Sequence, residues 1–217
     1  MGIDISGWVE VREGGSWQSV VTVWPLLARN YYMYKFVLGA WKEPGKTSIV
    51  EPRGIPPDVS APLREEYALA KAAEESTNAL RHAQLAQNPT AIDHHEYDIR
   101  AGWVTWNEIA SFDWERADNL LYAYEPDSRE AWRGHRTVRY HQSLSTIAGI
   151  SYDDVESGRH IWQEGQEWVV DGNVLRVEKI RRGDPRIRDW ELLFGLMELL
   201  SASYGGDNVR LVAWFEY

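Results

Sequence analysis

Polar side chains share one face of the first strand that the sequence predicts. The apolar positions that alternate with them are Ile3, Ile5, Val9 and Val11. This period of two is typical of a half-buried strand, and it places Asp4, Ser6 and Glu10 together on the opposite face. Carboxylates on one face of a sheet can bind a cation, orient a ligand hydroxyl or contact solvent. Asp4, Ser6 and Glu10 are therefore candidate ligand-binding residues.

The segment Asp93-His94-His95 is a second place where chemistry could occur. Glu96 and Asp98 follow it closely. Adjacent side chains on a strand point to opposite faces, so only one of the two histidines can join a given site. One histidine with carboxylates is a weak metal signature, and we expect no metal. Asp93 and His95 are candidate ligand-binding residues, and His95 is the catalytic acid/base if the protein is an enzyme.

Two arginine segments could bind an anion. Arg29-Asn30-Tyr31 stands at the start of a predicted helix, and Arg53 lies between a proline and a glycine in a proline-rich loop. A guanidinium offers a planar fork of N–H donors to phosphate or carboxylate, and helix N-terminal amides can add to it. Trp103 offers a ring on which a base could stack. The same arginines could instead donate to loop carbonyls, so both interpretations stay open.

Composition excludes several classes of protein. The 217 residues include no cysteine, which removes disulfides, thiolate nucleophiles and cysteine metal sites. A net charge of −10 argues against a nucleic-acid polymer as the main partner, because neutralising phosphates needs a basic field. The common nucleotide-binding and hydrolase motifs are missing. We expect no cofactor, no membrane segment and a cytoplasmic location, and a homo-oligomer stays open.

Two features of the composition fit either a structural or a binding role. A basic cluster stands out in this acidic chain, and its members are Arg176, Lys179, Arg181, Arg182, Arg186 and Arg188. Its charges either form a solvated face, paired with Glu178 and Asp189, or bind an acidic partner. The chain also has 12 Trp and 11 Tyr against 4 Phe. These amphipathic rings either fill the core or form a stacking or interaction face.

The elements that position the N-terminal candidates follow from periodicity and helix breakers. A turn at Gly14-Gly15 predicts a hairpin between the first strand and a second strand over 17–24. A short helix is expected over 26–38, ending at Gly39 in a left-handed cap. Prolines and glycines recur from 41 to 59 and indicate an ordered loop.

The middle of the chain predicts a long surface helix. It covers 61–85 after an N-cap at Ser60, and its apolar stripe is thin. A short strand over 101–104 follows, and Thr105 with Glu108 forms a capping box.

The C-terminal part predicts a hairpin, a helix and a strand in that order. Asp171-Gly172 is a turn between two runs rich in β-formers. A core helix follows Asp184-Pro185 and ends before Gly205, and a strand over 209–217 is apolar enough for a sheet interior. The predicted fold class is α+β in a single globular domain over 1–217, with a mixed or antiparallel sheet.

Four short segments of the first half resemble a known family. They are 1–6 (Met-Gly-Ile-Asp-Ile-Ser), 29–31 (Arg-Asn-Tyr), 52–60 (Pro-Arg-Gly-Ile-Pro-Pro-Asp-Val-Ser), and 93–95 (Asp-His-His) ahead of 102–106 (Gly-Trp-Val-Thr-Trp). They are similar to an uncharacterised family found mainly in bacteriophages and some bacteria. Its members begin Met-Gly-Cys-Asp-Ile-His and carry Arg-Asn-Tyr, Pro-Arg-Gly-Leu-Pro and Asp-x-His-Ser-x-Ser-Trp segments.

The chain departs from this pattern at two positions, where Ile3 replaces the cysteine and Ser6 replaces the histidine. A serine cannot replace a histidine as an acid/base or as a metal ligand.

The resemblance implies a phage context and one pocket built from the four segments. Our first hypothesis is a protein that sequesters a nucleotide-derived immune signal in the host cytoplasm, with arginines on phosphates and a tryptophan on the base. A second is a nucleotide hydrolase or phosphodiesterase in which His95 is the acid/base and Asp4 and Glu10 orient it or bind a divalent ion. A third is a protein-binding immunity protein or inhibitor.

Overall fold

A computed structural model describes most of the chain. The described residues are 4–24, 27, 30–40, 46–87, 99–124, 136–137, 162–170, 173–184 and 187–216. Their contacts group into two compact units, each with its own sheet. Unit 1 comprises Met1–Trp41, Ile49–Ser111 and Leu192–Tyr217, and unit 2 comprises Lys42–Ser48 and Phe112–Glu191. The single domain expected from the sequence stays a prediction.

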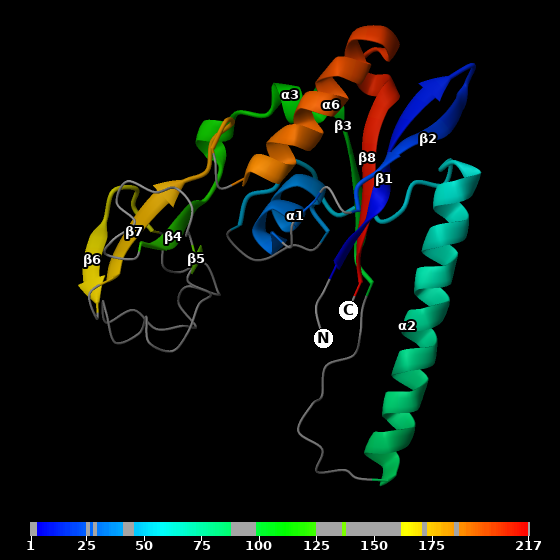
Figure 1. Ribbon diagram of the computed structural model, residues 1–217, viewed down its shortest axis with the longest axis horizontal. Helices are drawn as coiled ribbons and strands as arrows, with labels where there is room; N and C mark the ends of the chain where they lie inside the picture. The colour runs from blue at the N-terminus through cyan, green and yellow to red at the C-terminus, as the bar shows by residue number, and fades with distance from the viewer. Residues whose placement is uncertain are drawn as a thin grey trace. The chain divides into compact units, whose positions relative to one another are not determined.

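Unit 1 is built on a four-stranded antiparallel sheet in the order β2-β1-β8-β3 (Figure 1). The strands are β1 (Asp4–Glu13), β2 (Ser16–Thr22), β3 (Ala101–Thr105) and β8 (Val209–Glu216). Gly14 and Gly15 both have positive φ at the predicted turn, which confirms the N-terminal hairpin. The fold class is α+β, as the sequence predicts.

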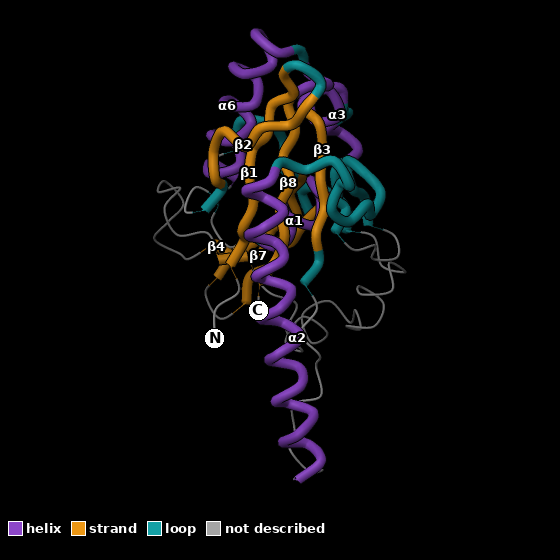
Figure 2. Tube along the Cα trace, turned by 90° about the vertical axis from the view of Figure 1, so that its right-hand side faces the viewer, coloured by secondary structure: helices purple, strands orange, loops and turns teal. Residues whose placement is uncertain are grey.

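One face of this sheet is a conventional apolar core. Ile5, Val9 and Val11 of β1 are buried there, as their alternation predicts. The unit also contains α1 (Tyr31–Leu38), α3 (Trp106–Ser111) and most of α6 (Arg188–Tyr204), which enters unit 1 at Leu192. Figures 1 and 2 place α1 and α6 on the side of the sheet opposite α2. A 3-10 turn, η4 (Gly206–Asn208), joins α6 to β8.

Helix α1 starts later than its sequence suggests. The carboxamide of Asn30 accepts a hydrogen bond from the Met33 amide at 3.1 Å and caps the helix, so that it begins at Tyr31. Gly39 takes the left-handed conformation with φ of 54°, which confirms the predicted C-terminal cap.

Helix α2 (Ala61–Gln87) covers the other face of the sheet with only part of its length. Of its 27 residues only Leu63 and Glu74 are buried, and Tyr67 packs edge-on against Trp214 with ring centroids 5.4 Å apart. Glu74 accepts a hydrogen bond from the amide of Ile99 at 2.7 Å, which ties the helix to the chain entering β3. The helix then runs past the sheet (Figure 2). The predicted long surface helix is confirmed.

Unit 2 contains a second antiparallel sheet in the order β5-β4-β7-β6. Its strands are β4 (Asn119–Tyr124), β5 (Arg136–Thr137), β6 (Glu167–Val170) and β7 (Asn173–Lys179), and η1 (Trp114–Arg116) precedes β4. The β6–β7 pairing confirms the predicted C-terminal hairpin, although its Asp171-Gly172 turn lies outside the described residues.

Candidate functional site

The polar face of β1 is covered by other elements. Glu10 lies directly across from Arg210 of β8, and Arg210 lies across from Thr105 of β3. Glu10 has 0% of its surface exposed and Arg210 has 2%. The solvent-facing interpretation of Glu10 is therefore wrong, because the start of α2 and the loop before it pack over this part of the strand.

Arg210 is the centre of a satisfied network of charges. Its Nε donates to Glu10 Oε2 at 2.9 Å, and its Nη1 donates to Asp58 Oδ1 at 2.8 Å. The second oxygen of Glu10 accepts the amide of Ser60 at 2.8 Å, and the second oxygen of Asp58 accepts the indole N–H of Trp17 at 2.9 Å. The carboxylates thus anchor the loop before α2 to the first and last strands, and the buried charges are paired and hydrogen-bonded.

Two tryptophans and two arginines alternate across this face. The Arg210 guanidinium carbon is 3.8 Å from the centre of the Trp17 ring and 5.8 Å from that of Trp103, and the Arg53 guanidinium carbon is 4.6 Å from the Trp103 ring. We call the set Trp17, Arg210, Trp103 and Arg53 the Trp–Arg ladder. A cation over an indole ring is attracted by the ring quadrupole, so these contacts hold the arginines against the rings.

Arg53 is the accessible end of the ladder. It keeps 27% of its side chain exposed and forks onto Glu108, with Nη1 donating to Oε2 at 3.1 Å and Nη2 to Oε1 at 2.5 Å. Glu108 also accepts the Thr105 amide at 2.9 Å while its own amide donates to the Thr105 hydroxyl at 3.3 Å. The predicted capping box is therefore confirmed, and it positions the carboxylate that holds Arg53.

The carboxylates of Asp58 and Glu108, which bind Arg210 and Arg53, are stabilised in their ionised forms. Burial raises the pKa of Asp58, but the hydrogen bond and charge of Arg210 together with the Trp17 N–H lower it further, so the net shift is downward. Burial likewise raises the pKa of Glu108, and the Arg53 fork and the Thr105 amide outweigh it, so this pKa is also lowered.

The stability contributed by Glu108 should depend on acid pH. A carboxyl with a lower pKa in the folded state binds protons more weakly when folded, so its contribution is present above the unfolded pKa of about 4 and is lost as pH falls through the folded value. Glu108→Gln should therefore be less stable than the wild type at pH 7 in urea unfolding, and the difference should shrink steadily below pH 4. A difference that is constant between about pH 7 and pH 2.5 would show that the charge of Glu108 plays no part.

The structure brings some of the sequence candidates together and separates others. Glu10, Arg53 and Trp103 belong to the network and ladder, and Ser6 lies on the same face across from Trp214.

Asn30 caps α1, on the opposite side of the sheet. Tyr31 is the first residue of α1, and Asp4 is paired with Glu216 at the first position of β1. The remaining candidates Arg29, Asp93 and His95 lie outside the described residues.

Four residues of this face were not among the site candidates from the sequence. They are Trp17, Asp58, Glu108 and Arg210. Arg210 did carry a signal, because it is the one charged residue inside the apolar run 209–215, which the sequence places in a sheet interior. A charge at such a position needs a buried partner. Within the described ranges, no group of histidine, aspartate and glutamate side chains could hold a metal ion.

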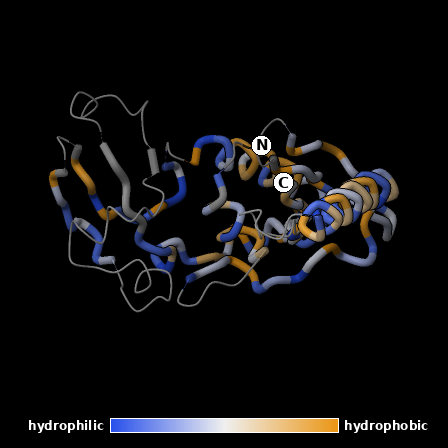
Figure 3. Tube along the Cα trace, turned by 90° about the horizontal axis from the view of Figure 1, so that it is seen from below, coloured by the Kyte–Doolittle hydropathy of each residue, from blue (hydrophilic) through white to orange (hydrophobic). Residues whose placement is uncertain are grey.

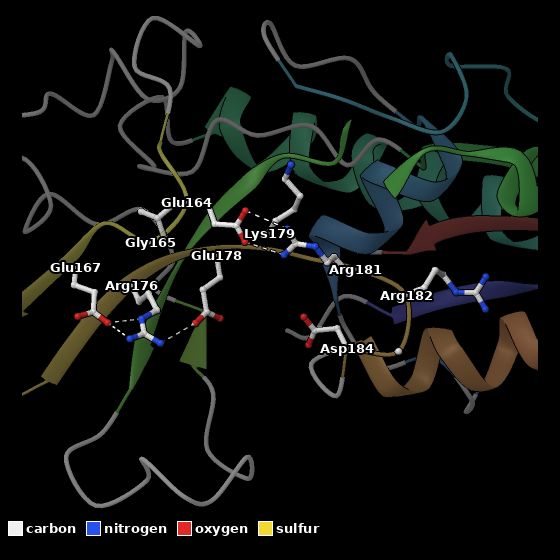
Figure 4. A pocket seen from close by; sticks show the side chains of 11 residues that line it. Glu164, Gly165, Glu167, Arg176, Glu178, Lys179, Arg181, Arg182 and Asp184 are labelled. Carbon is white, nitrogen blue, oxygen red and sulfur yellow. Dashed lines mark hydrogen bonds and ion pairs between the residues drawn. The ribbon is translucent and has the colours of Figure 1, made fainter. Parts of the chain in front are cut away.

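Four members of the basic cluster, Arg176, Lys179, Arg181 and Arg182, line a charged groove of about 590 Å³ (Figure 4). Arg176 pairs with Glu167 and with Glu178, and Arg181 forks onto Glu164 at 2.8 Å and Glu115 at 2.9 Å. The hydrogen bonds from Glu164 and then Glu115 raise the pKa of Arg181. Lys179 pairs with Glu115 and Arg182 with Glu191. These described cations are thus matched by carboxylates, which fits a solvated face of ion pairs.

Comparisons with known proteins leave the geometry as the basis for function. No protein-family model, curated protein or solved structure matches the chain. Among the helices that the structure describes, none has the length and apolarity needed to cross a bilayer.

Proposed function

We propose that unit 1 binds a small anionic, nucleotide-like molecule at the accessible end of the Trp–Arg ladder. The observation that carries the proposal is the placement of Arg53, a partly exposed guanidinium held 4.6 Å over the ring of Trp103. A guanidinium fork suits a phosphate, and the indole edge of Trp103 beside it suits a base or ribose.

Preorganisation supports this assignment. Trp103 is fixed in β3 beside Arg210, and Arg210 is itself fixed by Glu10 and Asp58. The ring and guanidinium that meet the ligand therefore lose little conformational freedom on binding, which favours affinity. An arginine that only donated to loop carbonyls would not need a tryptophan ring held in place beside it.

Glu108 competes with the ligand for Arg53. An arginine has five N–H donors, and Glu108 takes one from each terminal nitrogen of Arg53. A phosphate can use the remaining donors or displace the carboxylate. Two arginines, Arg53 and Arg210, face three carboxylates, those of Glu10, Asp58 and Glu108. The local net charge therefore does not attract anions, and recognition must depend on the hydrogen bonds that the Arg53 guanidinium donates.

The proposal can be tested by isothermal titration calorimetry. The probes are cyclic dinucleotides and cyclic ADP-ribose species, because the phage resemblance suggests a nucleotide-derived immune signal of the host. Binding is expected for at least one probe, and Arg53→Ala should weaken it by about 10- to 100-fold, since a charge-assisted hydrogen bond contributes about 1.5–3 kcal/mol. Arg12→Ala removes an exposed arginine from the same sheet and should change nothing.

A second variant separates a ligand site from a structural ion pair. Glu108→Gln keeps the capping box but weakens the competitor for Arg53, so it should bind the same probe more tightly than the wild type. If no probe gives heat with either protein, or if Arg53→Ala binds as well as the wild type, the assignment fails. Mass spectrometry of the recovered probe covers the enzymatic alternative, because a converted probe would favour the hydrolase in which His95 acts.

A further inference from the structure

Helix α2 carries apolar side chains on the face that points away from its own sheet. Its packed side includes Leu63, Tyr67 and Glu74. At about 100° per residue, a second row of side chains lies roughly on the opposite side. This outward stripe consists of Leu69, Ala73, Ser76, Leu80 and Ala83, all of them exposed and none of them charged.

Two of these residues are large apolar side chains. Leu69 is 72% exposed and Leu80 is 66% exposed, and they lie about three helical turns apart on one line. In Figure 3, where α2 is seen nearly end-on, hydrophobic and hydrophilic stretches are both found around the helix. An ordinary surface helix has one apolar face directed to the core, so an outward apolar stripe indicates a second partner.

The half of α2 that runs past the sheet has a further need for a partner. Beyond Glu74 none of its described residues is buried. Because most of its side chains are exposed, this half of the helix gains less stability from tertiary packing than the first half does. Its alanine-rich composition helps, but a neighbour along the outward stripe would stabilise it more.

We propose that this neighbour is the α2 helix of a second copy of the chain, packed antiparallel about a two-fold axis near Glu74 and Glu75. The residues Leu69, Ala73, Ser76 and Leu80 are four, three and four apart, so the order of spacings is the same in both directions. An antiparallel pair therefore sets Leu69 against Leu80 of the other copy and Ala73 against its Ser76. Small residues at the centre let the helices approach closely, with leucines packing on either side.

Charge selects the antiparallel orientation. The outward face has Glu65 beside it near the N-terminal end and Gln84 and Gln87 near the C-terminal end. A parallel pair would place the Glu65 carboxylates of the two copies side by side, which is unfavourable. The antiparallel pair places each Glu65 near the glutamines of the other copy. It also lays the C-terminal half of each helix along the N-terminal half of its neighbour.

The association test uses sedimentation equilibrium of the full chain without ligand. A dimer is expected, and Leu69→Glu with Leu80→Glu should raise its dissociation constant by at least about 100-fold, since four buried leucines are lost from a symmetric interface. Circular dichroism checks that the variant still folds, which is expected because both positions are exposed. The matched control is Leu192→Glu with Leu199→Glu, which changes the exposed leucines of α6 and should leave the dimer intact.

Cysteine cross-linking tests the orientation, since the natural chain has no cysteine. The double variant Leu69→Cys, Leu80→Cys should form a covalent dimer under mild oxidation. Each single variant should not, because identical positions are about 16 Å apart along an antiparallel pair, too far for a disulfide. A monomeric wild type, or single variants that cross-link as well as the double one, would overturn the proposal.

Discussion

Replacing Arg210 with methionine should destabilise unit 1 by about 3–5 kcal/mol. The substitution leaves Glu10 as a buried carboxylate without its cation, and breaking a buried pair by removing one partner costs about 3–5 kcal/mol. It also removes the guanidinium between Trp17 and Trp103. Urea unfolding followed by circular dichroism measures the change.

The matched double variant identifies the cause. In Glu10→Gln combined with Arg210→Met the buried charge is gone, so at least half of the lost stability should return, although the new carboxamide would still have to accept the Ser60 amide. The exposed Arg12→Ala serves as a control and should cost almost nothing. If the double variant is no more stable than Arg210→Met alone, packing rather than the charge pair determines the effect.

Gly7→Ala should be similarly severe, with a loss of about 3–5 kcal/mol. Gly7 has φ of 144° in the middle of β1, a conformation that other residues rarely adopt. A Cβ at this position would lie 2.2 Å from the carbonyl oxygen of Val212 in the neighbouring strand. Backbone strain and overpacking each contribute about 1–3 kcal/mol. A fall in the urea midpoint measures the result.

Gly14→Ala is the control for that prediction. Gly14 also has a positive φ, of 59°, but an added Cβ would meet nothing within 4 Å. Its substitution should cost only the conformational strain, about 1–2 kcal/mol. Equal losses for the two variants would show that the close approach of β1 and β8 at Gly7 is not limiting.

Local patterns in the sequence predicted most elements of unit 1. Alternation indicated β1, the double glycine indicated the hairpin, and Gly39 and the Thr105–Glu108 box marked helix ends. These signals involve residues close in sequence, where propensity and capping decide the outcome. The start of α1 was misplaced because Asn30 was considered as a ligand donor and its capping role was not.

The partners within the site could not be read from the sequence. Glu10 and Arg210 are 200 residues apart, and only the pairing of β1 with β8 makes them neighbours. Asp58 reaches the same guanidinium from a loop that has no periodicity at all. Strand order is set by packing, so Glu10 on β1 was found while the arginine that pairs with it was missed.

The central place of β8 gives unit 1 a high contact order. Its sheet has β8 between β1 and β3, and β8 follows the whole of unit 2 in the chain. A ribosome therefore releases every residue of unit 2 before the strand that joins the two sides of the first sheet. Loop-closure entropy must be overcome across about two hundred residues before β1 gains this partner, so unit 1 should fold after unit 2 and more slowly. Until β8 has been made, β1 and β3 both expose hydrogen-bonding edges, which makes the nascent chain prone to aggregate during that interval.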